Sequence, residues 1–429
     1  MVTPVWLLEG LVNDMVYHDI VIVGGGPAGM AAAVAAYDAG CTDVVILDRE
    51  PQLGGILMQC IHNGFGLHKL GKELTGPEYA AVYEEAVRKR NIQVYAETTV
   101  TTVSANKIVT AQNRQGILKI QAKAVILAMG CRERSRGALN ICGSRPAGVY
   151  SAGTAQKLVN CMGYQVGKRV VILGSGDIGL IMARRMSYEG AKVEAVCEIM
   201  PYSGGLPRNI AQCLEDFDIP LYLSTTIVQI HGKKRLEGVT IAQVDEQLQP
   251  IEETKRYIPC DTLLLSVGLI PENELTRSAG IPIDPVTNGA FVDENCQTKI
   301  PGIFACGNVL QVHDLVDYVS EEAERAGRGA TAYITGCNSG TDAIETVAGY
   351  GVRYIIPQTI CNKKEDTSLF LRVTHPFGKV KFTVADDENI LTTVTKLKVT
   401  PGEMEKVTIK RAVLEKATGP ITVSLEELA

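Results

Sequence analysis

Residues 19–50 read DIVIVGGGPAGMAAAVAAYDAGCTDVVILDRE, and this stretch decides the fold. A short apolar run leads into Gly24, Gly26 and Gly29, which have a GxGxxG spacing, and an alanine-rich run follows them. A second apolar run then ends at Asp48. This order predicts a buried strand, a tight turn, a helix and a second parallel strand, which together form a Rossmann-type nucleotide-binding unit.

The same pattern occurs a second time in residues 168–198, KRVVILGSGDIGLIMARRMSYEGAKVEAVCE. In both copies an acidic residue, Asp48 or Glu198, follows the first glycine by 24 positions (48 − 24 and 198 − 174). The ends of the two modules also match, because AVILAMG at residues 124–130 resembles TLLLSVG at residues 262–268. One unit is therefore used twice, and duplication is the simplest account.

The spacing also indicates what each unit binds. The first glycine allows the tight turn, the second lets the backbone approach a pyrophosphate, and the third lets the helix pack on the strand. The N-terminus of the helix then presents free N–H groups to the phosphates. Asp48 and Glu198 are placed to accept hydrogen bonds from ribose hydroxyls. We expect two dinucleotides, and we expect NAD rather than NADP at the second site because Glu198 would repel a 2′-phosphate.

Composition limits the class of protein. A chain of 429 residues, 46% hydrophobic and 21% charged, is typical of a globular protein with two or three domains. The net charge of −6 argues against nucleic acid or anionic lipid as a partner, and no apolar stretch predicts a transmembrane segment. The twelve cysteines contain no C-x-x-C pair, so we predict no metal site, although distant cysteines can still converge. Scattered thiols favour a reducing cytoplasm, and we read no signal peptide.

The predicted fold class is α/β, with two Rossmann-like dinucleotide-binding domains, one inserted into the other, and a small C-terminal antiparallel β domain that reads as a sandwich. The predicted boundaries are an N-terminal extension (1–17), a first domain in two parts (18–150 and 269–350), an inserted domain (151–268) and the β domain (351–429). Within the extension, residues 1–14 read as a disordered or alternative-start segment.

The chain resembles the two-dinucleotide flavoproteins of the pyridine nucleotide disulfide oxidoreductase fold. The resemblance covers residues 18–335 and rests on GGGPAG, AMG, GSGDIG, SVG and ACGN. Within that family, the segments GCRERSRG, RPAGVYSAGTAQ and QCIHNGFG are similar to the NAD(FAD)-dependent dehydrogenases associated with anaerobic glycerol-3-phosphate dehydrogenase, which are related to the flavin subunits of opine and amino-acid dehydrogenases. The resemblance implies that the first domain binds FAD and the inserted one NAD(H).

The resemblance also implies which residues contact each cofactor. The residues expected at FAD are Gly24, Gly26, Pro27, Ala28, Gly29, Asp48, Arg49, Gly55, Ala128, Met129, Gly130, Gly307 and Asn308. Those expected at NAD are Gly174, Gly176, Asp177, Ile178, Gly179, Glu198 and Gly268. Asn308 departs from the family, which usually has Asp in this turn, but an amide can still hydrogen-bond a flavin ribityl hydroxyl.

Three residues are candidates for catalysis. Cys60 is a possible charge-transfer or sulfenate-forming thiol, but it stands alone and is offset from the position of the family's redox pair, so dithiol chemistry is not expected. The alternative for Cys60 is simple packing in the core. His62 is a candidate hydrogen-bond donor to the flavin or to substrate, and the alternative is that it organises the loop around it. His313 precedes a predicted helix that points at the flavin in this fold, with Asp314 as the candidate cap of that helix.

The sequence is compatible with three functions. The leading one is a cytoplasmic FAD enzyme, expected to be oligomeric, that passes electrons between NAD(H) and a partner dehydrogenase subunit, which acts on glycerol 3-phosphate or another small hydroxy or amino acid. A lone C-terminal Cys361 cannot supply an iron–sulfur cluster, so such a cluster would have to lie in the partner. The alternatives are a self-contained oxidase, peroxidase or disulfide reductase that uses Cys60, and a flavin-bearing scaffold subunit without NAD turnover.

Overall fold

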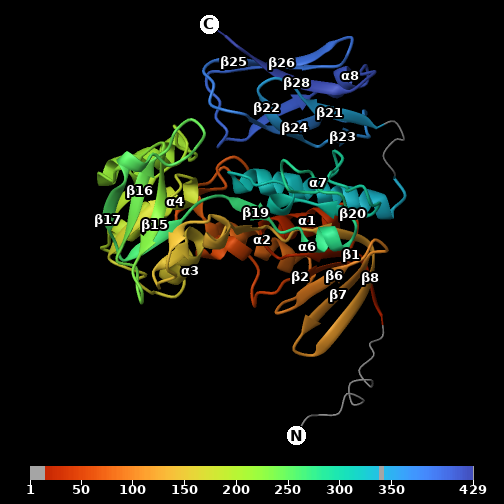
Figure 1. Ribbon diagram of the computed structural model, residues 1–429. Helices are drawn as coiled ribbons and strands as arrows, with labels where there is room; N and C mark the ends of the chain where they lie inside the picture. The colour runs from red at the N-terminus through yellow and green to blue at the C-terminus, as the bar shows by residue number, and fades with distance from the viewer. Residues whose placement is uncertain (1–14, 338–342, 429) are drawn as a thin grey trace. The chain divides into compact units, whose positions relative to one another are not determined.

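The computed structural model describes residues 15–337 and 343–428, and their contacts divide the chain into two units (Figure 1). The first unit contains the described residues up to Met58, then Asn63–Cys131 and the chain from Pro271 onward. The second contains Gln59–His62 and Arg132–Ile270. The predicted segment 1–14 lies outside the described residues. Among the helices that the structure describes, none is long and apolar enough to cross a bilayer.

The first unit is built on a parallel sheet in which strands follow the order β5-β2-β1-β8, with β20 beside β8. The repeat that opens the sequence forms β1, α1 and β2, as the glycine spacing predicts. The elements of this layer are β1 (Val16–Val23), α1 (Pro27–Asp38), β2 (Val44–Leu47), α2 (Gly76–Lys89), β5 (Gln93–Tyr95), β8 (Gly116–Leu127) and β20 (Ile303–Ala305).

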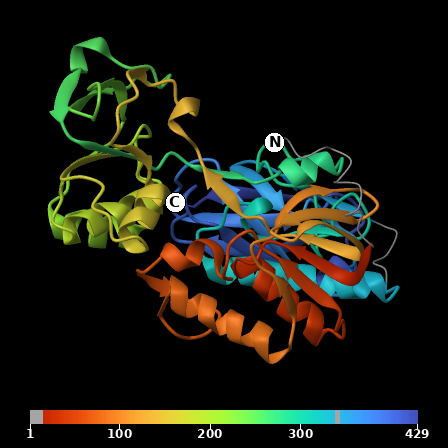
Figure 2. The ribbon, with the colours of Figure 1, turned by 90° about the horizontal axis from the view of Figure 1, so that it is seen from below.

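Both faces of this sheet are buried, which is why its strands are apolar throughout. Ile20 and Ile22 of β1 pack on one face with α1, α2 and α7 (Val316–Ile334), while Val21 and Val23 pack on the other. That second face is covered by the antiparallel strands β6 (Thr99–Val103) and β7 (Ile108–Asn113) and by residues 279–292. Figure 2 shows α1 and α2 side by side against the sheet. Parallel strands covered on both faces are characteristic of α/β folds.

The chain returns to the first unit after the second module, as the sequence predicts. Strand β20 pairs with the carboxyl end of β8, and α7 packs closely along α1. A Cβ atom added at Gly327 of α7 would lie 2.3 Å from the carbonyl oxygen of Ala32, so the small residues of α7 allow the two helices to approach. The Thr331 hydroxyl donates to the Ala36 carbonyl at 3.2 Å.

The second unit repeats this architecture with an all-parallel sheet in the order β11-β18-β12-β13-β14. A smaller sheet of β10, β15, β16 and β17 accompanies it. The elements are β10 (Cys142–Gly143), β11 (Val149–Ser151), α3 (Ala152–Asn160), β12 (Arg169–Leu173), α4 (Asp177–Tyr188), β13 (Lys192–Cys197), α5 (Pro207–Cys213), β14 (Leu221–Tyr222), β15 (Thr225–His231), β16 (Gly238–Gln243), β17 (Arg256–Pro259) and β18 (Thr262–Leu265).

The C-terminal strands of the first unit form the expected sandwich. A five-stranded sheet, β23-β21-β28-β25-β26, shares one apolar core with the three-stranded sheet β22-β24-β27. One pair, β21 and β28, is parallel in an otherwise antiparallel domain, which strand alternation in the sequence does not reveal. The elements are β21 (Ile344–Ala348), β22 (Val352–Ile356), β23 (Thr359–Ile360), β24 (Thr367–Val373), β25 (Val380–Ala385), β26 (Ile390–Lys396), β27 (Glu405–Ile409), α8 (Arg411–Leu414) and β28 (Ile421–Glu427).

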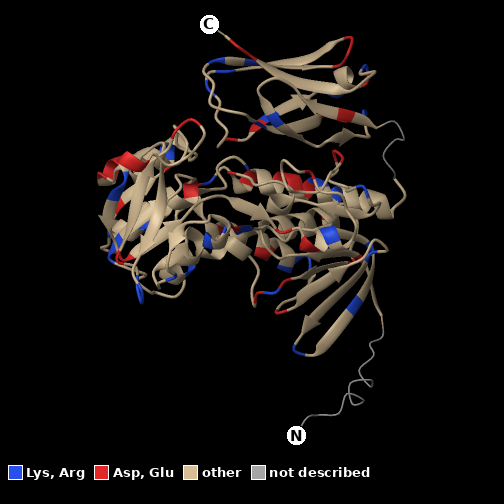
Figure 3. Ribbon diagram, viewed as in Figure 1, with Lys and Arg blue, Asp and Glu red and all other residues tan. Residues whose placement is uncertain are grey.

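The structure thus confirms the predicted fold class. The unit boundaries lie elsewhere than the domain boundaries expected from the sequence, since residues 132–150 belong to the second unit and β21 begins at Ile344. Acidic and basic residues are interspersed along the described chain (Figure 3).

Candidate functional site

The first glycine turn joins β1 to α1, and each of its three glycines has a separate structural reason. Gly24 has φ +110°, and a Cβ atom there would lie 2.4 Å from the Ala128 carbonyl oxygen. A Cβ at Gly29 would lie 1.7 Å from the carbonyl oxygen of Gly24. A Cβ at Gly26 would meet no atom within 4 Å. The space beside Gly26 is therefore open, which leaves at the N-terminus of α1 the cradle that a pyrophosphate would require.

Asp48 lies at the end of β2 and is tied to this turn. Its Oδ2 accepts a short hydrogen bond from the backbone N–H of Gly25, and its Oδ1 accepts one from Glu50 N at 2.7 Å. The carboxylate is buried, with 9% of the residue exposed. Asp48 thus stands beside the glycine turn, where an adenosine ribose would reach it.

The second glycine turn, between β12 and α4, has the same geometry. A Cβ at Gly174 (φ +98°) would lie 2.0 Å from the Ser266 carbonyl oxygen, and one at Gly179 would lie 2.7 Å from the Gly174 carbonyl oxygen. The nearest atom to a Cβ at Gly176 is the Ser266 hydroxyl, 3.8 Å away. The second turn therefore also leaves a cradle beside its middle glycine.

Glu198 makes the same kind of backbone contacts as Asp48, with a side chain that is one carbon longer. Its Oε2 accepts from Ser175 N at 2.9 Å and from the Ser175 hydroxyl at 2.6 Å, and its Oε1 accepts from Met200 N at 3.0 Å. Both acidic residues therefore accept from the residue after the first glycine and from the residue two positions after themselves. The geometry of both turns fits the dinucleotides expected from the sequence.

Other residues expected at FAD gather around the first turn. A Cβ at Gly55 would lie 3.1 Å from the Gly26 Cα, and one at Gly307 would lie 2.8 Å from the Ala28 Cβ. Ala128 N donates to Val23 O at 2.9 Å. Pro27 is the first residue of α1, Met129 and Gly130 follow Ala128, and exposed Arg49 follows Asp48. The structure brings these segments together; direct contact of each with FAD stays a prediction.

In the second unit, Asp177 closes a loop over the start of α4. Its Oδ1 accepts from Leu206 N at 2.8 Å and from the Asn209 amide at 2.7 Å. Ile178 follows it in α4, and Gly268 lies just after Ser266, which borders the turn. Asp177 thus shapes the edge of the proposed NAD cradle by holding the loop before α5.

Asn308 occupies the late turn where the family usually has Asp, and its amide bridges two segments. Oδ1 accepts from His313 N at 3.0 Å, while Nδ2 donates to the Cys131 sulfur at 3.5 Å. An aspartate could accept from His313 but has no N–H to give to Cys131. The amide therefore matches its two neighbours, which gives a physical reason for the departure.

His313 lies in a buried polar cluster rather than on open surface, since its side chain is 1% exposed. Its Nε2 is 3.4 Å from a carboxylate oxygen of Glu322, which is fully buried on α7. Glu322 also accepts from Gly307 N and from the Gln311 amide, both at 2.7 Å. Burial by itself would raise the pKa of Glu322, but His313, Arg325 and the Gln311 hydrogen bond hold that pKa below its usual value. A charged carboxylate therefore holds this turn in place.

Cys60 contacts Gln156, a residue of the second unit. Its thiol lies 3.9 Å from Gln156 Oε1, and the neighbouring Gln59 amide donates to Gln156 Oε1 at 2.9 Å. Burial, with a smaller contribution from Cys161, raises the pKa of the Cys60 thiol to about 12. The thiol is therefore protonated at neutral pH, which disfavours a thiolate nucleophile.

His62 also belongs to the second unit. Burial, followed by the charges of Arg184 and Arg208, lowers its pKa to about 4. The imidazole is therefore neutral at physiological pH, which is compatible with a hydrogen-bonding role and not with a cationic one. Catalytic roles for Cys60, His62 and His313 stay predictions.

The residues that the sequence predicts for this site do not include Ser175 or Glu322. Ser175 sits in an ordinary turn context, and no local pattern marks it. Glu322 does leave a signal, because it occurs on the small apolar stripe of α7 with Ala323, Ala326 and Ala330. A charged residue on a buried helix face indicates a buried polar partner. Asp314, the candidate helix cap, makes no side-chain cap of α7.

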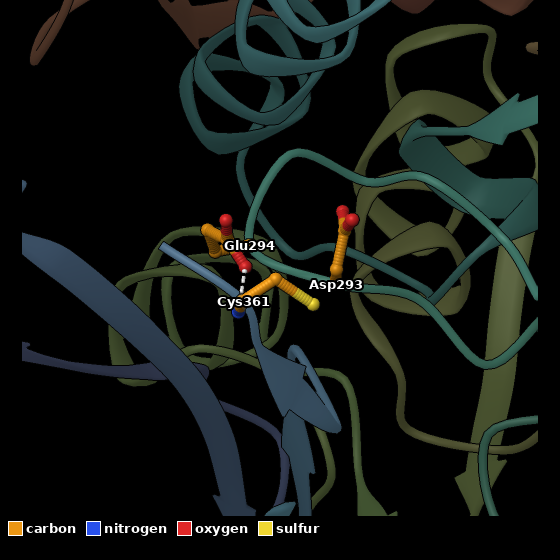
Figure 4. Close-up of side chains that lie close together, drawn as sticks. All are labelled: Asp293, Glu294 and Cys361. Atoms are coloured by element: carbon orange, nitrogen blue, oxygen red, sulfur yellow. Dashed lines mark hydrogen bonds between the residues drawn. The ribbon is translucent and has the colours of Figure 1, made fainter. Parts of the chain in front are cut away.

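A separate cluster joins the C-terminal strands to the rest of the first unit. One ligand-capable atom from each of Asp293, Glu294 and Cys361 lies within 4.8 Å of the others, and Figure 4 shows Glu294 hydrogen-bonded to the Cys361 backbone. Glu294 accepts from Cys361 N at 2.7 Å and from Asn362 N at 3.1 Å. Asp293 Oδ1 accepts from two further backbone amides. These carboxylates therefore act as acceptors for loop and strand backbone.

This cluster predicts a pH-dependent stability. Burial, then the charge of Asp293, raises the pKa of Glu294 from 4.5 to about 7. Between these two pH values, Glu294 is protonated in the folded state and ionised in the unfolded state. The free energy of unfolding therefore falls as the pH rises from about 4.5 to about 7. Between about pH 4.5 and pH 7 we therefore expect the free energy of unfolding of the wild type to fall by about 3 kcal/mol, whereas Glu294→Gln, which cannot ionise at this position, should lack this fall.

Urea unfolding at pH 5 and pH 8 measures this effect. Glu365→Gln, at an exposed position on the same connection, serves as the control and should show the wild-type pH dependence. Equal pH dependence in Glu294→Gln and the wild type would contradict the assignment.

Comparison with known proteins agrees with this geometry. Residues 18–330 match the family model described as pyridine nucleotide-disulphide oxidoreductase, which ends before the C-terminal strands. An opine oxidase subunit from Agrobacterium tumefaciens (strain Ach5) is 24% identical over 319 residues, which cover 68% of this chain and 61% of that protein. Mitochondrial dihydrolipoyl dehydrogenase of Caenorhabditis elegans is 27% identical over 329 residues, with 68% and 63% covered. The chain therefore spans less than two thirds of the length of these relatives.

A solved structure shares the fold. The thioredoxin reductase of T. acidophilum superposes with a TM-score of 0.61 and 24% identity, and the match covers 74% of this chain and 98% of that chain. This likeness supports the α/β architecture with two nucleotide-binding domains.

Proposed function

This chain belongs to the pyridine nucleotide-disulphide oxidoreductase family, whose members bind FAD and NAD(P)H, and from that premise we propose that it is an FAD-dependent NAD(H) oxidoreductase. The observation that carries the proposal is the doubled glycine turn, with a cradle beside Gly26 in one unit and beside Gly176 in the other. Each cradle has a carboxylate at the same relative position, Asp48 or Glu198.

The chain's own residues bind and orient in this proposal. Bound NADH and FAD supply the chemistry, which is transfer of a hydride from the nicotinamide to the flavin. The N-termini of α1 and α4 present backbone N–H groups to the two pyrophosphates. Asp48 and Glu198 would accept hydrogen bonds from the ribose hydroxyls, and Glu322 holds the turn that contains Asn308. No side-chain acid, base or nucleophile is required for hydride transfer between stacked rings.

We assign NAD rather than NADP to the second unit. Both oxygens of Glu198 already accept backbone N–H groups, so the carboxylate is fixed beside the glycine turn. A 2′-phosphate placed there would meet a fixed negative charge, whereas a ribose hydroxyl would donate to it.

We further propose that the electrons pass to or from a partner dehydrogenase subunit in the cytoplasm. The opine oxidase relative is, by its name, one component of a larger enzyme, and this supports such a role for the present chain. The resemblance to dehydrogenases associated with anaerobic glycerol-3-phosphate dehydrogenase makes glycerol 3-phosphate, or a related small hydroxy or amino acid, the proposed substrate of the partner. Oligomeric assembly is part of this proposal.

Assays of the purified chain test whether the substrate is oxidised by this chain or by the partner subunit. We expect NADH to reduce an artificial dye through the flavin, while glycerol 3-phosphate and amino acids are not oxidised. Robust turnover of such a substrate by this chain alone would contradict the partner proposal. Co-purification from the native host, followed by identification of the associated protein, tests whether a partner dehydrogenase subunit exists.

A second candidate is a self-contained thiol enzyme that uses Cys60. The raised pKa of this thiol weighs against it, because the reactive form is the thiolate. We therefore expect Cys60→Ser to reduce its flavin with NADH within about twofold of the wild-type rate, since ring stacking needs no thiol. Stopped-flow measurement under anaerobic conditions checks this, with Cys161→Ser as a matched control in the same unit. Abolished turnover in Cys60→Ser alone would favour the thiol mechanism.

A third candidate is a flavin-bearing scaffold subunit whose NAD site is silent. Anaerobic addition of NADH distinguishes it, because bleaching of the flavin band at a catalytic rate excludes a silent site.

A further inference from the structure

Arg372 links the C-terminal strands to residues 312–314, which follow the turn at Gly307 and Asn308 where FAD is expected. Arg372 on β24 donates from Nη2 to Val312 O at 2.9 Å and to Asp314 Oδ1 at 3.2 Å. Its Nη1 donates to Pro401 O at 3.0 Å, and its Nε donates to the Tyr354 hydroxyl at 3.2 Å. Two guanidinium nitrogens, Nε and Nη1, are thus held by the C-terminal domain, while the third, Nη2, binds residues 312–314.

The ion pair between Arg372 and Asp314 is buried. The two side chains are 13% and 5% exposed. Asp314 also accepts from Met404 N at 3.3 Å, so a second segment of the C-terminal domain holds the same carboxylate. Removing one partner of such a pair leaves a buried charge uncompensated, which is costly.

The residues that Arg372 binds lead directly to the flavin turn. His313 lies between Val312 and Asp314, and its backbone N–H donates to Asn308 Oδ1 at 3.0 Å. Gly307, next to Asn308, packs against Ala28 at the start of α1 and donates to Glu322. A continuous set of contacts therefore runs from Arg372 to the turn expected to hold the flavin.

We propose that the C-terminal β domain forms part of the flavin site, and that Arg372 is a positioning residue that fixes the Gly307–Asp314 turn for FAD binding. The inference rests on the proposed function, since it requires that this turn contact FAD. It assigns a role to a domain that lies outside the residues matched by the family model.

The geometry explains why arginine is needed here. A guanidinium offers donors on three sides of one plane, and Arg372 uses them for four acceptors in three directions. A lysine ammonium keeps the charge but cannot span Tyr354, Pro401 and Val312 together. Arg372→Lys should therefore preserve the ion pair and lose the backbone contacts that fix the turn.

The test compares FAD binding by flavin fluorescence in the full-length apoprotein. We expect Arg372→Met to bind FAD at least ~10-fold more weakly than the wild type, as loss of a charge-assisted contact network would give. We expect Arg372→Lys to fall between the two. Arg353→Met, at an exposed arginine on the neighbouring strand β22, is the matched control and should bind FAD as the wild type does.

Hydrogen exchange of the apoproteins gives a readout independent of flavin. In Arg372→Lys we expect faster exchange in residues 307–315 and unchanged exchange in β25 and β28, which keeps the test decisive where Arg372→Met does not fold. Unchanged FAD affinity in Arg372→Lys together with unchanged exchange in the turn would overturn the inference. Absence of FAD binding by the wild type would instead overturn the proposed function, so the two failures are distinguishable.

Discussion

Replacing Gly26 by valine should abolish FAD binding while the apoprotein stays folded. Gly26 has ordinary extended backbone (φ −73°, ψ −171°), and a Cβ there meets no protein atom within 4 Å. The added methyl groups would fill the cradle in which the pyrophosphate approaches the backbone. We expect at least a ~100-fold loss of FAD affinity, which corresponds to about 2.7 kcal/mol, and a melting temperature of the apoprotein within about 2 °C of the wild type.

Two comparisons make this prediction specific. Gly378→Val, at a position in the C-terminal domain that is also open around its Cβ, should change neither affinity nor stability. Gly24→Ala should destabilise the apoprotein itself, because the backbone has φ +110° and the new Cβ would lie 2.4 Å from a carbonyl oxygen. Wild-type FAD affinity in Gly26→Val would show that the cradle is not the pyrophosphate site.

Replacing Gly176 by valine should have the complementary effect. Its backbone is also extended (φ −67°, ψ 162°), and its Cβ would meet only the Ser266 hydroxyl, at 3.8 Å. The purified variant should stay yellow, since the first unit is unchanged, but it should no longer accept NADH. We expect the rate of anaerobic flavin reduction at low NADH to fall at least ~100-fold, with FAD affinity unchanged.

The pair of glycine variants tests whether the two units hold unlike ligands. Reduction by dithionite, which needs no nucleotide site, is the control and should proceed in Gly176→Val as in the wild type. Loss of flavin from Gly176→Val, or wild-type reduction by NADH, would contradict the assignment of NAD to the second unit.

The glycine turns could be predicted because their chemistry is local. Gly24 and Gly174 have positive φ angles, and a carbonyl oxygen lies close to where a Cβ atom would sit. Because only glycine satisfies both conditions, the turns appear in the sequence as glycines at a fixed spacing. The acids that follow, Asp48 and Glu198, are placed by the length of one helix and one strand. The sequence alone is therefore enough to predict the two glycine turns and the carboxylates beside them.

The rest of the site depends on contacts between distant segments. Nothing near Asn308 in the sequence indicates that Glu322 accepts from its turn or that Arg372, on β24, binds it from the C-terminal domain. The sequence makes Cys60 a catalytic candidate because it lies in the loop expected near the flavin ring, but its burial against Gln156 in the second unit is a tertiary property. The pKa of its thiol follows from that burial and not from neighbours in the chain.

We propose that this one chain holds FAD and NAD(H) in two similar units and transfers hydride between them. The most direct measurement is anaerobic titration of the FAD-loaded protein with NADH, followed at the flavin absorption band, with NADPH in parallel. We expect bleaching by one equivalent of NADH per flavin and much slower bleaching by NADPH. A flavin that stays oxidised in excess NADH would contradict it.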